Sequence, residues 1–503
     1  METIGLTSHD FYLLAPELSI AGLAALIVVL DLFIRRKSFL PWVTVIGLAV
    51  PLGFSIALWF SLNNDGVAEM QGVFGSLVVD KFSLFFKFLF IGVVALVTLV
   101  STDYVKRFPK FQAEYYALLL FSTTGMMLLA STTDLITIFI ALEMTALPIA
   151  ALAAFLRTSR SAESGMKFFI LSAISSAILL YGMVIVYGFT GTTTLSVIAS
   201  QIENLNLNSD TPFGSPALLF GIVLMIAGFG FKIASVPFQM WAPDVYEGAP
   251  TPVTAFLSVA SKAAGFAVIL RVFYIAFSLD ILSLDWGAIF AVLSVLSMTI
   301  GNLIAIRQDN IKRMLAYSTV AHAGYLLVGL AAVAARSSDA QAGLGPSGVL
   351  FYLGGYAATN FAAFSTIIAI SNRIGSDMID DFAGMARRTP YLSAVLGFSM
   401  ISLIGVPPTV GFITKVYVFG AAVDANLAWL AVAGVINSVL SAYYYLRVVK
   451  VMYLEPPTTD EPISSGLPMR IAVLSTFAGV AFFGIYPTPL LNLARTAASV
   501  LVS

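Results

Sequence analysis

The amino-acid sequence predicts an all-α protein that crosses a membrane many times. Of the 503 residues, 59% are hydrophobic and 11% are charged, whereas a soluble domain has about 25% charged residues. Four ionisable side chains nevertheless lie deep inside apolar segments: Glu143, Lys232, Lys262 and Lys415. Since a charge at that depth costs about 2.5–3.5 kcal/mol on insertion scales, four of them in one chain indicate a series of sites that moves protons or cations.

Composition also excludes several other kinds of site. The formal net charge of −1 argues against nucleic acid, which binds to a basic face. Cysteine is absent, and His9 and His322 are the two histidines of the sequence. These residue types hold iron–sulfur clusters and structural zinc, so we expect no bound cofactor and no metal on this chain.

Fourteen segments reach the length of about 20 mostly apolar residues that a bilayer span needs. Their approximate bounds are 11–34, 39–61, 82–102, 113–132, 134–156, 166–189, 216–237, 252–277, 286–306, 313–334, 347–371, 391–420, 426–451 and 469–490. The chain is then one membrane domain, 1–503. We divide it into three N-terminal helices (11–102), a first repeat of helices 4–8 (113–277), a second repeat of helices 9–13 (286–451) and a last helix (469–490).

Lysine and arginine predict how these spans are oriented, because basic residues concentrate in cytoplasmic loops. Eighteen of the 26 lie on one set of alternate loops, between Arg35 and Arg470, and four lie within spans. The other side holds Lys81, Arg271, Arg336 and Arg495. We therefore expect the first set to be cytoplasmic and both chain termini to lie outside.

Two spans, the seventh and the twelfth, are interrupted. Span 7 meets Pro237 soon after Gly228, Gly230 and Lys232, and span 12 carries Gly-Val-Pro-Pro-Thr-Val-Gly at 405–411. Proline breaks a helix, and broken backbone at membrane depth is tolerated where it is buried in protein or lines a wet cavity. The breaks are five spans apart, so the two segments enter the membrane from opposite sides. This predicts an inverted repeat with sites at the broken helices.

Glu143 and Lys232 are the expected functional pair. An opposite charge nearby keeps both groups ionised, so moving the carboxylate away would eject the proton of the lysine. Lysine suits this role because, unlike arginine, it loses its proton readily when buried. The alternatives are a structural ion pair for Glu143 and, for Lys232, a side chain that reaches the membrane interface.

The other charged residues have similar alternatives. Lys262 lies near mid-span among small neighbours, and Lys415 follows the second break, but either lysine could be purely structural. Glu114 at the start of span 4 is a relay residue or an interfacial cap. His322, midway along span 10, suits proton transfer or is simply hydrogen-bonded. Lys87, early in span 3, is expected to reach the interface.

Three sequence motifs resemble those of a known family of membrane proteins. The sequences FKIASVPFQMWAPDVYEGAPTPV at 231–253, IKRMLAYSTVAHAGY at 311–325 and GVPPTVGFITK at 405–415 resemble the antiporter-like membrane subunits of respiratory complex I. The VYEGAPTPV wording is similar to subunit N, the chain 2 type of mitochondria and chloroplasts. One departure is Pro-Pro-Thr-Val-Gly-Phe, where Pro-Pro-Leu-Ala-Gly-Phe is commoner in the family; it leaves Lys415 in register.

The resemblance implies roles for these residues. Glu143 and Lys232 match the glutamate–lysine pair of the family, Lys262 its connecting lysine and Lys415 the second-half lysine of subunit N. Glu114 and His322 also fall on family positions. The chain would then be a proton-translocating membrane-arm subunit of NADH–quinone oxidoreductase, beside other antiporter-like and small K-type subunits. NADH, FMN, iron–sulfur clusters and quinone would be bound elsewhere in that complex.

Two other functions stay open from the sequence. An Mrp-type sodium/proton antiporter would use the same lysines without a redox partner, and a structural scaffold would use the charges for packing. The electron donor could also be ferredoxin or F420, since that choice lies on other chains. A bacterial plasma membrane is the expected location, with a thylakoid or mitochondrial inner membrane as alternatives.

Overall fold

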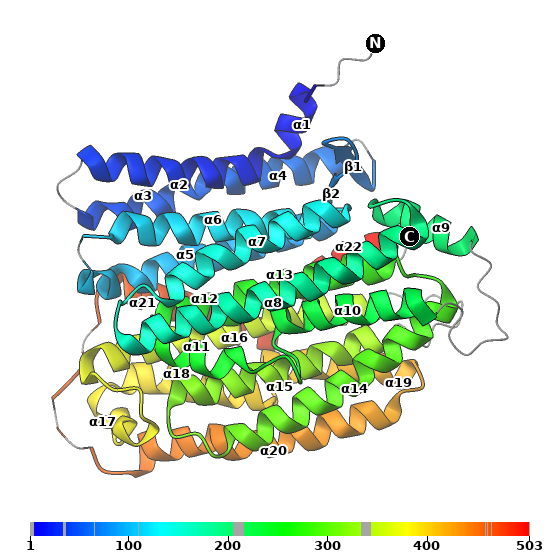
Figure 1. Ribbon diagram of the computed structural model, residues 1–503. Helices are drawn as coiled ribbons and strands as arrows, with labels where there is room; N and C mark the ends of the chain where they lie inside the picture. Colours follow the sequence, from blue (N-terminus) through cyan, green and yellow to red (C-terminus); the bar gives the residue numbers. More distant parts are fainter. Residues whose placement is uncertain are drawn as a thin grey trace.

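The apolar segments form long helices that lie side by side in one bundle, as Figure 1 shows. The structure is a computed structural model that describes residues 5–33, 37–64, 66–108, 110–204, 216–332, 344–457, 459, 461–463 and 465–501. Within these residues, thirteen helical stretches are long and apolar enough to cross a membrane. The predicted all-α, polytopic membrane architecture is confirmed. Arg35, Arg36 and Arg336, which entered the orientation argument, lie outside the described residues.

The N-terminal part contains five helices and a β-hairpin. Its elements are α1 (Ser8–Leu13), α2 (Ala15–Phe33), α3 (Leu40–Gly47), α4 (Ala49–Asn64), β1 (Glu69–Gly72), β2 (Leu77–Asp80) and α5 (Lys81–Tyr104). The antiparallel hairpin occupies the connection 62–80, where the sequence predicts a loop. Asp80 ends β2 and caps α5, because its carboxylate accepts a hydrogen bond from the backbone of Ser83 at 2.7 Å.

The middle of the chain corresponds to the first predicted repeat. Its elements are α6 (Gln112–Ser131), α7 (Leu135–Ala153), α8 (Ser159–Thr190), α9 (Leu195–Asn204), α10 (Pro216–Ile233), α11 (Trp241–Gly248), α12 (Thr251–Phe256), a π-helical turn η3 (Leu257–Ser261) and α13 (Lys262–Ile275). Every residue in the most apolar window of the stretch Thr251–Ile275 is buried. This stretch is therefore the centre of the bundle.

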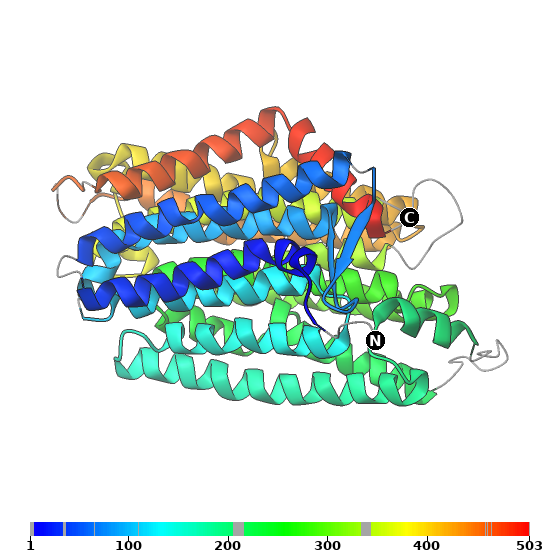
Figure 2. The same ribbon diagram turned by 90° about the horizontal axis from the view of Figure 1, so that it is seen from above.

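The last part corresponds to the second predicted repeat and the final helix. Its elements are α14 (Asp280–Ala305), α15 (Ile311–Ala331), α16 (Leu344–Ile374), α17 (Met385–Arg388), α18 (Pro390–Ile404), α19 (Val410–Asp424), α20 (Ala428–Leu454), α21 (Leu467–Ile485) and α22 (Thr488–Ala498). Helices α21 and α22 return to pack on α5, which Figure 2 shows from above. The first and last helices, α1 and α22, lie at the same end of the bundle (Figure 1).

The two predicted breaks are present, with small corrections to their bounds. The seventh expected span, 216–237, corresponds to α10, which ends at Ile233 before the short helix α11. The twelfth expected span is two helices, α18 and α19, separated by residues 405–409. Gly405 caps the end of α18, and its φ is +89°. The last expected span, 469–490, ends as α21 at Ile485, before α22. The equivalence of the two repeats and the domain boundaries remain predictions.

Candidate functional site

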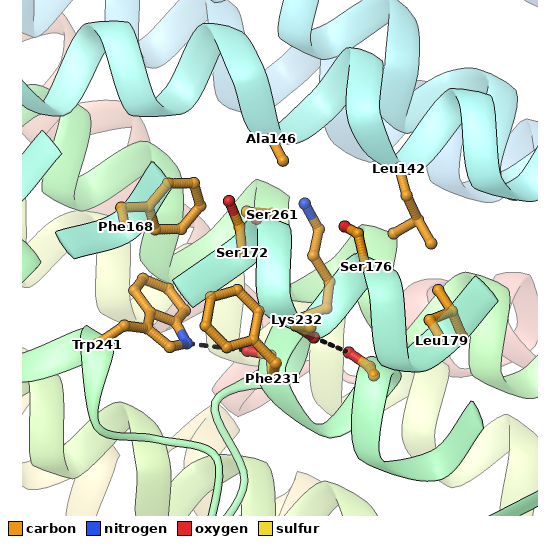
Figure 3. A pocket seen from close by; sticks show the side chains of 12 residues that line it. Leu142, Ala146, Phe168, Ser172, Ser176, Leu179, Phe231, Lys232, Trp241 and Ser261 are labelled. Carbon is orange, nitrogen blue, oxygen red and sulfur yellow. Dashed lines mark hydrogen bonds between the residues drawn. The ribbon is translucent and has the colours of Figure 1, made fainter. Parts of the chain in front are cut away.

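Lys232 lies in the last turn of α10, beside the first break, and its side chain is buried. Its ammonium points into a cavity of about 30 Å³ between α7, α8 and α10, which has room for about two waters. Figure 3 shows this ammonium between the side chains of Ser172 and Ser176 of α8. Lys232 Nζ has no hydrogen-bond partner among the described residues. The broken end of α10 therefore lies beside a cavity large enough for water to reach Lys232.

Glu143 of α7 is connected to this cavity through Ser176 of α8. The Ser176 hydroxyl donates a short hydrogen bond to the Glu143 carboxylate and also lines the Lys232 cavity. Glu143 and Lys232 act on each other electrostatically without a direct contact. The predicted pair is thus brought together through a shared serine, not as an ion pair.

The half-buried Glu143 also opens to the outer surface of the chain. It lies in an apolar groove of about 520 Å³. The groove is lined by Leu118, Phe121, Phe139, Ile140, Met144, Leu147 and Pro148. A carboxylate in such a groove can respond to the charge of whatever covers the groove, because little water is there to screen it.

Lys262 begins α13, directly after the π turn, and is buried in the centre of the bundle. Its ammonium donates a short hydrogen bond to the backbone carbonyl of Thr319 on α15. The same ammonium lies 5.7 Å from the centre of the Tyr356 ring on α16. The Thr319 hydroxyl is in turn 3.0 Å from the Tyr356 hydroxyl, so Lys262 contacts a polar cluster between α15 and α16.

His322 is the middle of that cluster. Its Nδ1 is 2.7 Å from the hydroxyl of Tyr352, and its Nε2 is 3.2 Å from the hydroxyl of Tyr445 on α20. Tyr445 also makes a short hydrogen bond to Ser318. The His322 ring packs against the rings of Tyr356, at 4.9 Å, and Tyr325, at 5.5 Å. Histidine therefore links the residues around Lys262 to those around Lys415.

Lys415 on α19 reaches back to the second break. Its ammonium donates to the carbonyl oxygens of Leu403 and Ile404, at 3.0 and 2.8 Å, and to the hydroxyl of Ser438 at 2.7 Å. The two carbonyls end α18, and a helix C-terminus carries unpaired carbonyls and partial negative charge. The break thus supplies the acceptors for a buried cation.

Glu114 is not brought into this arrangement. It lies in the first turn of α6 with an exposed side chain, apart from the cavity residues and from the cluster around His322. The predicted relay therefore has five members inside the described bundle, with Glu114 at its surface.

Four tyrosines are functional candidates that the sequence did not single out: Tyr325, Tyr352, Tyr356 and Tyr445. Tyr352 and Tyr356 are four residues apart on α16, so they share one helix face. That spacing was a usable signal. The position of Tyr445 was not, because α20 comes beside α15 only in the folded chain.

Two further buried ion pairs correct the positions expected for Lys87 and Arg271. Lys87 is fully buried and lies 2.8 Å from Glu17 of α2, so it does not reach the interface. Arg271, which the sequence argument counts on the outer side, is buried in α13 with both terminal nitrogens on the Asp80 carboxylate at 3.0 and 3.1 Å. The Glu17–Lys87 pair joins α2 to α5 within the N-terminal part, and the Asp80–Arg271 pair attaches that part to α13.

The acidic segment after the first break is neutralised by basic neighbours. Asp244 of α11 accepts hydrogen bonds from Lys167 and Arg313, both at 2.7 Å, and Glu247 accepts one from Arg313 at 2.9 Å. Partial burial alone would raise the pKa of Asp244, but these two hydrogen bonds outweigh burial and hold that pKa below its usual value. This network joins α8, α11 and α15 beside the Lys232 cavity.

Within the described part of the chain, no group of three or more His, Asp or Glu side chains is arranged to hold a metal ion. The site is therefore built from lysine, glutamate, histidine and tyrosine, which are groups that exchange protons.

Comparison with known proteins places this arrangement in a family. A family profile described as NADH:quinone oxidoreductase/Mrp antiporter, TM, matches residues 132–441. The chain is similar to proteins named NADH-quinone oxidoreductase subunit N from Dehalococcoides mccartyi, 42% identical over 493 residues, and Trichlorobacter lovleyi, 43% identical over 487 residues. These matches cover 97% and 96% of this chain and 99% and 96% of the relatives.

Solved structures agree with this assignment. A chain of respiratory complex I from Thermus thermophilus is 30% identical, with a TM-score of 0.77. The match covers 95% of this chain and 99% of that one. A chain of the Mrp complex from Dietzia sp. DQ12-45-1b, 21% identical with a TM-score of 0.84 over 99% of this chain and 98% of that one, shares the fold. The chain belongs to the NADH:quinone oxidoreductase/Mrp antiporter family of membrane proteins, among its NADH-quinone oxidoreductase subunit N members.

Proposed function

We propose that this chain carries protons through a relay that runs from Glu143 to Lys232, Lys262 and Lys415, as subunit N of the membrane arm of an NADH-quinone oxidoreductase. The observation that carries the proposal is the continuous polar cluster between the last two lysines. Lys262 contacts Tyr356 and Thr319, His322 packs on Tyr356 and Tyr325, and Lys415 lies over Tyr325. Such a cluster offers donors and acceptors along one line through the bundle.

Glu143 would start the relay. Its carboxylate is placed to respond to a neighbouring subunit through the apolar groove and to Lys232 through Ser176. When the Glu143 carboxylate stabilises the protonated form of Lys232 less strongly, Lys232 releases its proton toward Lys262. Moving one elementary charge against 100 mV costs about 2.3 kcal/mol, and rearranging one Glu–Lys pair in a site of low dielectric constant supplies energy of that size.

The rest of the complex would supply the energy for this movement. The names of the relatives refer to NADH and quinone, so we assign quinone reduction, and the NADH, FMN, iron–sulfur and quinone sites, to other subunits. The bacterial relatives and the distribution of Lys and Arg favour a bacterial plasma membrane with both termini on the outer side. His322 joins the relay in this proposal, and Glu114 has a surface role.

The experiment replaces Lys232 with Ala in the assembled complex, reconstituted into vesicles, and measures quinone reduction and proton pumping. We expect pumping to fall at least about tenfold, in line with the loss of one proton-transfer group. Lys450→Ala is the matched control, because Lys450 lies near the end of α20 with 66% of its side chain exposed. Normal pumping and quinone reduction in Lys232→Ala would refute the relay.

The same vesicles separate the two alternatives. Sodium-dependent pH changes driven by the chain alone would favour an Mrp-type antiporter. Complexes that fail to assemble in every single-charge variant, without a selective loss of pumping, would favour a structural scaffold.

A further inference from the structure

A pocket of about 270 Å³ lies where α5 and α16 end and α21 begins, on the side predicted to be cytoplasmic. Lys106 and Arg107 line it from the 3-10 turn η2 (Val105–Arg107) that follows α5. Asn372 and Arg373 line it from the last turn of α16, and Ser465 from the segment just before α21. The pocket is far larger than the Lys232 cavity of about 30 Å³, so it has room for a chemical group much bigger than water.

This pocket carries a positive charge. Three basic side chains, Lys106, Arg107 and Arg373, line it together with one acidic side chain, Asp103, which leaves a formal charge of +2. The Lys106 ammonium lies 2.6 Å from the Asp103 carboxylate, so these two charges match each other. The two arginines supply the remaining charge, and a planar guanidinium fits the oxygens of a phosphate group better than an ammonium does.

Both arginines have donors available for such a ligand. Arg107 is held in place because it donates to the side-chain oxygen of Asn372 at 2.9 Å and lies 4.6 Å from the centre of the Tyr104 ring. The hydrogen bond to Asn372 occupies one of the five N–H groups of its guanidinium. The Arg373 side chain makes no hydrogen bond or ion pair with another residue that the structure describes. Two guanidinium groups can therefore converge on one anion.

An apolar stripe on α5 leads from the pocket toward the middle of the membrane. Leu99 and Leu96 lie four and seven residues before Asp103, so the three share one helix face. Both leucines are half-buried, and Gly92, one turn further, is exposed with open space beside it. From Asp103 to Gly92 the stripe is about 16 Å long, about half the thickness of the hydrocarbon core. Its length therefore matches a single leaflet of the bilayer.

We propose that this pocket binds the phosphate headgroup of an anionic phospholipid of the cytoplasmic leaflet, with Arg107 and Arg373 on the phosphate and an acyl chain along the α5 stripe. Basic pockets between helices on the cytoplasmic side of a membrane bind such headgroups. A free phosphate would use the arginines and leave the stripe unused. Phosphatidylcholine would bring a second cation into a pocket that is already positive. The bound lipid would join α5 of the N-terminal part to α16 and α21 of the last part.

The test places the assembled complex in phosphatidylcholine vesicles that contain a small share of phosphatidylglycerol with a photoreactive acyl chain. After irradiation, mass spectrometry of peptides locates and counts the lipid adducts. We expect adducts on residues 92–103 of α5 in the wild type. They should fall at least about tenfold in the double variant Arg107→Gln/Arg373→Gln, because each basic residue near the surface adds to the attraction for an anionic lipid.

A second variant separates the loss of the pocket from the loss of charge. Ser465→Phe keeps every charge and places a large ring in the pocket, so it should lower the labelling of α5 as the double arginine variant does. The matched control is Arg387→Gln/Arg470→Gln. Arg387 and Arg470 are exposed on the same predicted side, and neither lines the pocket. This control removes the same amount of charge and should label α5 like the wild type.

Four results would overturn the inference: unchanged labelling of α5 in Arg107→Gln/Arg373→Gln, unchanged labelling in Ser465→Phe, an equal loss in the control, or equal labelling by a photoreactive phosphatidylcholine. Titration of the lipid-free complex in detergent with inorganic phosphate covers the other source of this chemistry. Phosphate binding that needs Arg107 and Arg373, without lipid labelling of α5, would assign the pocket to a free phosphate instead. The labelling requires no turnover, so its result is independent of whether Lys232→Ala stops pumping.

Discussion

The ammonium of Lys415 lies 4.6 Å from the centre of the Tyr325 ring, whose hydroxyl accepts a hydrogen bond from the amide of Asn302. A cation over an aromatic face gains about 0.5–2 kcal/mol. The ring, and not the hydroxyl, is therefore what Lys415 needs. We expect Tyr325→Phe to pump at nearly the wild-type rate and Tyr325→Leu to pump several-fold more slowly.

Proton pumping in vesicles, normalised to quinone reduction, checks this expectation. Equal loss in Tyr325→Phe and Tyr325→Leu would mean that the hydrogen bond to Asn302 at 3.2 Å matters more than the ring.

The close approach of α18 and α19 predicts a strict need for glycine at position 411. A methyl group added there would lie 1.8 Å from the carbonyl oxygen of Ser402, which belongs to the backbone of α18. Overpacking of this kind costs about 1–3 kcal/mol. We expect Gly411→Ala to lower the thermal stability of the complex and to slow pumping, because it moves Lys415 away from the carbonyls of Leu403 and Ile404.

Gly420→Ala is the control for that substitution. Gly420 lies on the same helix and has open space where a methyl group would be added. It should leave pumping unchanged and melt at the wild-type temperature or slightly above it, since alanine favours helix more than glycine does. Identical behaviour of the two variants would contradict the proposed contact.

The buried pair of Glu17 and Lys87 predicts a strongly non-additive double-mutant cycle. Their charged atoms are 2.8 Å apart with 2% and 0% of the side chains exposed. Removing one partner leaves an uncompensated charge, which costs about 3–5 kcal/mol, whereas replacing both is often neutral. We expect Lys87→Met and Glu17→Leu each to destabilise the complex and the double variant to recover most of the loss. Thermal denaturation measures this; additive losses would show that the two charges do not interact.

The network around Asp244 predicts a pH-dependent stability. Burial raises the pKa of Asp244, but Lys167 and Arg313 outweigh burial and hold that pKa below its usual value. The ionised Asp244 therefore stabilises the fold fully at pH values above the usual pKa of a carboxyl group. That contribution is lost as the pH falls through the lowered pKa. Asp244→Asn should therefore melt earlier than the wild type at pH 7, and the difference should shrink in acid. A difference that does not change with pH would argue against an ionic contribution.

The helical architecture was accessible from the sequence because a bilayer imposes a length and a composition on each span. Thirteen of the expected spans are single helical stretches, and the remaining one is the α18–α19 pair that glycine and proline predict. The hairpin at 69–80 was missed, since its short strands leave no periodic pattern that differs from a loop.

The buried lysines were also identifiable, because a lone charge in an apolar run is costly and therefore conspicuous. Their partners were less accessible. Sequence reasoning paired Glu143 with Lys232 directly, while Ser176 stands between them in the structure. Lys87 lacked an obvious partner because Glu17 lies near the start of another helix, and pairs between distant segments are set by packing.

The π turn at Leu257–Ser261 makes the length of this helix a constraint in its own right. Deleting one residue from the turn would restore an ordinary helix and rotate everything on one side of it by about 100° relative to the other. Lys262 would then leave the carbonyl of Thr319, or Thr254 would lose its hydrogen bond to the carbonyl of Tyr246; both contacts could not survive together. Surface loops of this chain can change in length without such a cost, whereas here a shift in residue count would be as damaging as the loss of the lysine itself.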